Sequence, residues 1–115
     1  MKFIYQRDYY LFESDKQAKP KVYFIPKPKE GLGIDSMGEL AVSLQLSCQF
    51  LDQEGKPAPL ILISNALESA FNFEFGGVYK SKVRIFNRKP FNLTKALDFL
   101  RNLIIRESRN KQNEK

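Results

Sequence analysis

The sequence predicts an α+β domain in which an antiparallel β-sheet precedes a C-terminal amphipathic helix that packs on one face of the sheet. Three observations predict this fold class: an alternating segment over residues 41–51, a second alternating segment with two central glycines over residues 71–86, and a helical periodicity after Pro90. The chain has 115 residues, which is the length of one ordinary domain. We therefore expect a single domain over residues 1–106 and a basic, disordered tail over residues 107–115.

The alternation in residues 41–51 is the clearest strand signal. Apolar residues there alternate with uncharged polar ones, as in a half-buried antiparallel strand. Cys48 falls in the apolar set and is expected in the core. Residues 52–56 are predicted as a turn and residues 27–33 as a surface loop. Residues 22–25 and 60–64 are predicted as further strands, and residues 65–68 as a short helix, with a strand as the alternative there. The apolar positions of the alternating segment are Val42, Leu44, Leu46, Cys48 and Phe50.

Residues 71–86 are predicted as a hairpin around Gly76-Gly77, and its register decides what the side chains do. A two-residue loop would place Phe71, Phe73 and Phe75 on one face with lysines, a surface suited to single-stranded nucleic acid. A three-residue loop would place the phenylalanines in the core. Burial favours the second register, because three exposed phenylalanines would each forfeit roughly 1.5–3 kcal/mol.

The C-terminal helix is predicted from apolar residues at i, i+3, i+4 and i+7, with Asn92 as its N-cap. The apolar positions are Leu93, Ala96, Leu97, Leu100, Leu103 and Ile104.

The composition argues against an enzyme. Histidine is absent and Cys48 is the single cysteine, which excludes a disulfide, a cysteine zinc site and histidine-based nucleophile systems within the chain. No cofactor is expected, because Gly31 and Gly33 do not form a phosphate loop. The best catalytic alternative is a metal-dependent nuclease using Asp35, Glu54 and Lys56. Glu54 and Lys56 lie in a predicted turn, which makes this the weakest of the hypotheses.

The net charge of +6 is distributed unevenly. Residues 1–35 carry +2, residues 36–74 carry −4 and residues 75–115 carry +8. Such polarity favours an anionic partner. We expect a non-enzymatic nucleic-acid-binding accessory protein, with single-stranded DNA or RNA preferred, that uses a basic strand face. The predicted nucleic-acid-binding residues are Lys80, Lys82, Arg84, Phe86, Arg88 and Lys89.

Two other interpretations of the same charge stay open. The row of cations formed by Lys80, Lys82 and Arg84 would also protect an edge strand from aggregation. The chain would equally suit a protein-interaction module, such as a small inhibitor or subunit that docks on an acidic surface of a larger complex. The aromatic N-terminal segment, residues 3–12, is predicted as core or as the interface of a homo-oligomer. No segment is long and apolar enough for a membrane span, and an early charged start argues against a secretory leader, so a cytoplasmic location is expected.

Overall fold

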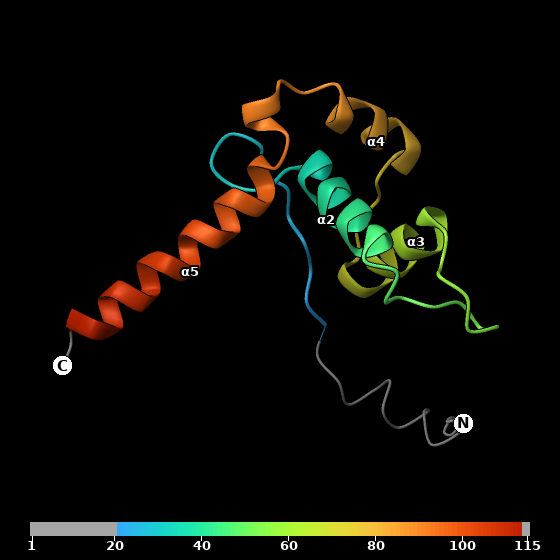
Figure 1. Cartoon of the computed structure of the whole chain (residues 1–115), viewed down its shortest axis with the longest axis horizontal. Helices are drawn as coiled ribbons and strands as arrows, with labels where there is room; N and C mark the ends of the chain where they lie inside the picture. The colour runs from blue at the N-terminus through green and yellow to red at the C-terminus, as the bar shows by residue number, and fades with distance from the viewer. Residues whose placement is uncertain (1–20, 114–115) are drawn as a thin grey trace, which may run out of the picture.

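The computed structural model describes residues 21–113, and within that range the protein is helical (Figure 1). The predicted antiparallel sheet is therefore wrong. The pairing between Leu51 and Pro57 is an isolated bridge, and no strand occurs in the described range. The elements are α2 (Ile34–Leu46), α3 (Leu60–Phe71), α4 (Val78–Phe86), the 3-10 helix η1 (Pro90–Asn92) and α5 (Lys95–Asn113).

Helix α2 replaces the first part, residues 41–46, of the strand predicted over residues 41–51, and residues 47–51 follow the helix without forming a strand. It begins after Gly33, whose N–H donates to Ser36 Oγ at 2.9 Å. Its buried residues are Ser36, Met37, Gly38, Glu39, Ala41 and Val42, which lie around most of the helix circumference, so this part of α2 is covered on several sides. Cys48 lies just past the helix with φ 60° and is exposed, so its predicted core position is also wrong.

Helix α3 takes the place of the strand predicted over residues 60–64 and extends the short helix predicted over 65–68. It starts directly after Pro59, whose backbone is extended (φ −69°, ψ 161°) and whose C=O accepts the Ile63 N–H at 3.3 Å. Leu60, Ile63 and Ser64 are buried at i, i+3 and i+4. The helix ends at Asn72, which adopts the left-handed conformation (φ 53°, ψ 56°) typical of a helix C-terminus.

The predicted hairpin over residues 71–86 is a helix–loop–helix, so neither hairpin register exists. Gly76 and Gly77 have φ of 72° and 121°, values that favour glycine, and they turn the chain into α4. Phe75 is buried, and its N–H donates to Glu68 Oε2 at 2.8 Å, which ties the loop to α3. Residues 22–25, predicted as a strand, form no strand either; Phe24 N–H donates to Phe71 O at 2.9 Å.

Helices α2, α3 and α4 enclose the core (Figure 1). Helices α2 and α4 approach each other closely: a Cβ added at Gly38 would lie 3.0 Å from Ser81 Cβ and 3.3 Å from Ile85 Cδ1. Small residues at this crossing allow the two backbones to come close together. The loops over residues 27–33 and 52–56 are present as predicted, the second as a turn with Gly55 at φ 82°.

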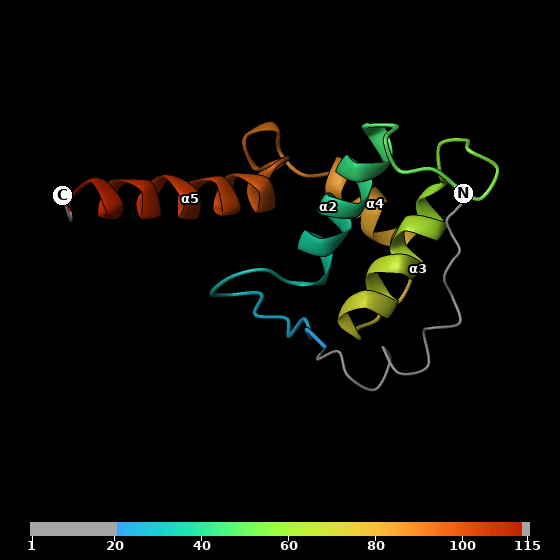
Figure 2. The same ribbon diagram turned by 90° about the horizontal axis from the view of Figure 1, so that it is seen from below.

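Helix α5 leaves this bundle and extends away from it, which Figure 1 and Figure 2 both show. The helical prediction for this segment is confirmed, but its packing on a sheet is not. Ala96 is the one residue buried along α5. The helix continues through Asn113, into the segment predicted as a tail, and Asn92 lies in η1 instead of capping it. The predicted N-terminal aromatic segment lies outside the described residues.

Candidate interaction surface

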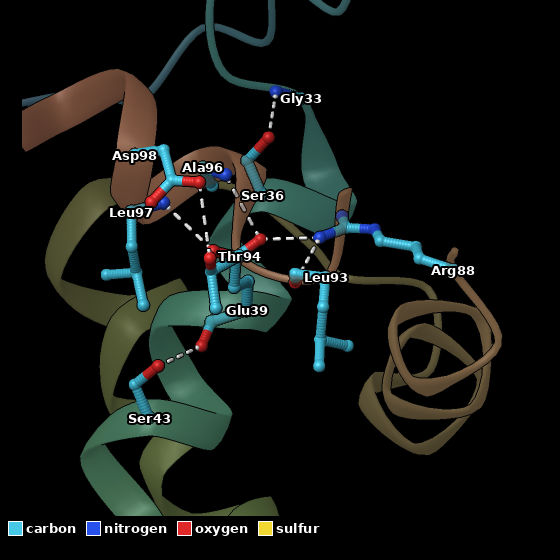
Figure 3. A network of polar contacts seen from close by, with 10 residues as sticks. All are labelled: Gly33, Ser36, Glu39, Ser43, Arg88, Leu93, Thr94, Ala96, Leu97 and Asp98. Atoms are coloured by element: carbon cyan, nitrogen blue, oxygen red, sulfur yellow. Dashed lines mark hydrogen bonds and ion pairs between the residues drawn. The ribbon is translucent and has the colours of Figure 1, made fainter. Parts of the chain in front are cut away.

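The start of α5 is held by a buried carboxylate from α2 (Figure 3). Glu39 Oε1 accepts a hydrogen bond from the Ala96 N–H at 3.2 Å, and Oε2 accepts one from the Leu97 N–H at 2.9 Å. The first N–H groups of a helix lack intrahelical acceptors and form its positive end, so a carboxylate there both satisfies donors and stabilises the helix. Glu39 therefore caps α5 from a different helix, a role that the sequence pattern predicts for Asn92.

The same carboxylate forms a buried ion pair. Arg88 Nη1 lies 2.5 Å from Glu39 Oε1, and the side chains are only 12% and 4% exposed, respectively. Arg88 Nη1 also donates to Leu93 O at 3.1 Å. The pair thus links α2, the segment after α4 and the segment before α5, and it fixes where α5 leaves the bundle (Figure 3).

A second ion pair lies one helical turn away along α2. Arg84 binds Asp35 through two hydrogen bonds, Nε to Oδ2 and Nη2 to Oδ1, each of 2.8 Å. Ser81 Oγ donates to Asp35 Oδ1 at 2.9 Å. The hydrogen bond from Arg84 lowers the pKa of Asp35 below its ordinary value, and the same contact raises the pKa of Arg84. This pair joins α2 to α4.

The predicted basic row is not a row in the structure. Lys80, Lys82, Arg84 and Phe86 lie in α4, and Arg88 and Lys89 follow it. A helix turns by about 100° per residue, so Lys82 lies about 160° around the axis from Arg84. Arg84 and Arg88 are neutralised by carboxylates of α2. The strand geometry behind the site was wrong, and nucleic-acid contact by these six residues stays a prediction.

The outer face of α4 is apolar as well as basic. Tyr79, Val83 and Phe86 are each about half exposed and recur at i, i+4 and i+7, so they share one side of the helix. Lys82 lies beside them, three residues after Tyr79 and four before Phe86. A helix with apolar residues on both its buried and its outer face presents surface that a partner can cover.

Helix α5 carries the second uncovered apolar surface, which we call the α5 stripe: Leu97, Leu100, Leu103 and Ile104. These side chains fall within an arc of about 120° around the helix axis. Leu97 and Leu100 are half-buried, whereas Leu103 and Ile104 are 39% and 72% exposed. Sequence periodicity identified this stripe, but it could not show that the bundle leaves its C-terminal half, Leu103 and Ile104, exposed.

An open hollow of about 770 Å³ lies between the loop before α2, α4 and the start of α5. Its polar lining residues include Asp35, Ser36, Arg84 and Arg88. Each of these is already engaged: the two arginines in ion pairs, and Ser36 Oγ as the acceptor for the Gly33 N–H. These four side chains therefore position the helices, and we assign them a structural role; Lys95, which is exposed, also lines the hollow.

The residues of the nuclease hypothesis are not brought together. Asp35 is at the start of α2, whereas Glu54 and Lys56 lie in the turn beyond its far end. Lys56 Nζ is 3.8 Å from Glu54 Oε1, and both side chains are exposed. Within residues 21–113 no three acidic, cysteine or histidine side chains gather as metal ligands would.

Comparison with known proteins gives no relative: no family model, curated protein or solved structure matches the chain. None of the described helices combines the length and the apolar content that crossing a bilayer requires.

Proposed function

We propose that the protein is a non-catalytic protein-interaction module that docks through α5. The observation that carries the proposal is the exposure of the α5 stripe on a helix that leaves the bundle (Figure 2). Helices in proteins owe most of their stability to the packing of an apolar face, and fully burying a leucine or isoleucine side chain contributes roughly 1.5–3 kcal/mol. A partner that covers the stripe would supply that missing packing.

The polar anchoring of α5 supports the same function. Glu39 and Arg88 fix the first turn of α5 to the bundle, so the helix is presented in one direction before any partner arrives. Such preorganisation reduces the entropy lost on binding. The bundle would then act as the base from which α5 is displayed.

The proposal is tested with Ile104→Asp, which places a charge on the most exposed position of the stripe. The matched control is Ile61→Asp, at an exposed isoleucine of α3. A photo-crosslinking side chain at residue 103 identifies what contacts α5 in nuclease-treated extract. We expect one crosslinked protein that Ile104→Asp removes and Ile61→Asp retains. A crosslink that survives Ile104→Asp would contradict docking through the stripe.

A second candidate, nucleic-acid binding, is favoured by the outer face of α4. Tyr79 and Phe86 flank Lys82 there, and aromatic rings beside a cation suit the bases and phosphates of a single strand. Mobility shifts on single-stranded DNA and RNA over a salt series test it. If this face binds, affinity falls steeply with salt and Lys82→Glu weakens it, whereas Lys56→Glu in the distant turn does not.

A further inference from the structure

The two edges of the α5 stripe are both basic. Taking about 100° per residue, Arg101 lies about 40° beyond one edge of the stripe, and Arg106 lies about 60° beyond the other edge, past Phe99. Arg109 lies on the opposite side of the helix from the stripe. Over its full length, α5 has five basic and two acidic residues, a net charge of +3.

This charge pattern opposes pairing with a second copy of α5. In a parallel pair, the Arg101 edge of one helix would meet the Arg106 edge of the other. In an antiparallel pair, each edge would meet its own copy. Both orientations bring arginine against arginine beside a desolvated apolar seam, where like charges are destabilising.

The same pattern complements an acidic helix. A partner helix with an apolar stripe of similar width would cover Leu97, Leu100, Leu103 and Ile104, in the way that helices pack along narrow seams. Carboxylates at its two edges would then face Arg101 and Arg106. Arginine is well suited to such contacts, because its planar donors match a carboxylate.

Resting on the proposed function, we infer that the partner of α5 is an acidic amphipathic helix of another protein. Glu107 lies on the line of the stripe, one turn past Leu103, and marks where the apolar seam ends. The partner's apolar segment therefore spans about two turns, matching residues 97–104.

The test uses the full chain and three labelled helical peptides in fluorescence anisotropy. The first has a leucine stripe edged by glutamate, the second has the same stripe edged by lysine, and the third has the composition of the first with the stripe scrambled. We expect the first peptide to bind, and to bind at least tenfold more weakly when salt rises from low to high concentration.

Variants of α5 separate the contribution of apolar contact from the contribution of charge to peptide binding. Ile104→Ser removes apolar contact and should weaken binding about tenfold, given the transfer free energy of one such side chain. Arg101→Glu and Arg106→Glu should weaken binding of the glutamate-edged peptide and improve binding of the lysine-edged one. Arg109→Glu, with the same charge change on the far side, is the matched control and should change neither by more than a small factor.

Three results would overturn the inference. They are equal binding of the two edged peptides, binding of the scrambled peptide, and no binding of any peptide. Sedimentation of the chain alone adds a fourth: self-association that Ile104→Ser abolishes would assign the stripe to a second copy. That result would leave α5 as a docking helix and refute only the acidic partner, whereas an extract crosslink insensitive to Ile104→Asp would refute the proposed function itself.

Discussion

Among the polar contacts of residues 21–113, those of the Glu39 carboxylate should be the most costly to remove. In Glu39→Ala the Arg88 guanidinium, 12% exposed, loses its counter-ion, and two N–H groups of α5 lose their acceptor. Breaking a buried ion pair from one side costs about 3–5 kcal/mol, and losing a helix cap costs about 1 kcal/mol. The two effects share one carboxylate and are not additive, so we expect a loss of about 3–5 kcal/mol.

Urea denaturation followed by far-ultraviolet circular dichroism measures this loss as a shift of the midpoint. Because small domains are stable by only about 5–15 kcal/mol, the shift is a large part of the total. Amide hydrogen exchange at Ala96 and Leu97 reports the helix start separately, and protection there should fall.

A double substitution separates the ion pair from the cap. Replacing both partners of a buried pair with apolar residues is often nearly neutral, so Glu39→Met with Arg88→Leu should recover most of the lost stability. The amides of Ala96 and Leu97 would still lack their acceptor and should keep exchanging faster than in the natural protein. A loss below about 1 kcal/mol in Glu39→Ala, or full protection of both amides in the double variant, would refute this account of the network.

Three further predictions concern the bundle. Because Arg84 lowers the folded-state pKa of Asp35, the pair stabilises the protein above the ordinary aspartate pKa of about 3.9, and this contribution is lost as pH falls through the lowered value. The difference in urea midpoint between the natural protein and Asp35→Asn should therefore shrink on acidification, and a constant difference would argue against the pair. Gly38→Val forces α2 and α4 apart and should cost about 1–3 kcal/mol, measured by urea denaturation; an unchanged midpoint would show that the crossing is not tight. Phe75→Ala should cost about 3–5 kcal/mol, whereas Phe91→Ala, at a residue 77% exposed, should stay within about 0.5 kcal/mol, and similar losses for the two would contradict the placement of the core.

The C-terminal helix could be predicted from the sequence because its apolar residues keep one helical period over several turns. The turn over residues 52–56 was also predictable, since it rests on local chemistry: Asp52 Oδ1 accepts the N–H groups of Glu54 and Lys56 at 2.8 and 3.0 Å. Both depend on residues near one another in the chain, which is why sequence alone sufficed.

The strand over residues 41–51 was wrong because an alternating pattern can arise inside a helix, as it does over residues 41–46, and can continue into the irregular segment 47–51 that follows. Of its apolar positions only Val42 is buried, whereas Leu46 is 66% exposed. Between residues 41 and 50 Val42 is also the single β-branched residue, which is a weak composition for a strand. The burial pattern that the helix follows starts earlier, at Met37, outside the alternating window.

The strand predicted over residues 78–86 was wrong for a different reason. Its composition of valine, isoleucine and aromatic residues does favour a strand. Val78, Ser81 and Ile85 are buried at i, i+3 and i+7, and α2 packs against this side. Contacts between helices distant in sequence decide its conformation, and local propensity cannot anticipate them.

Charge along the chain was a poor guide to charge on the surface for a related reason. Asp35 and Glu39 are spaced four residues apart in α2, and the arginines that they bind, Arg84 and Arg88, have the same spacing. Each acidic residue thus cancels a cation 49 positions away. The matched spacing is visible in the sequence, but only a packed α2 and α4 gives it meaning.

Because two cations of this region are paired with α2, we propose α5, and not α4, as the part of the basic C-terminal third that binds a partner. Arg84 and Arg88, the two arginines of the predicted basic row, form ion pairs with α2 that hold the bundle together, and Arg88 also helps to place α5. By contrast, Arg101 and Arg106 lie on a helix that leaves the bundle, beside the exposed side chains of Leu103 and Ile104. A polyanion needs accessible cations alone, whereas a folded partner needs cations beside an apolar surface, and α5 offers that combination.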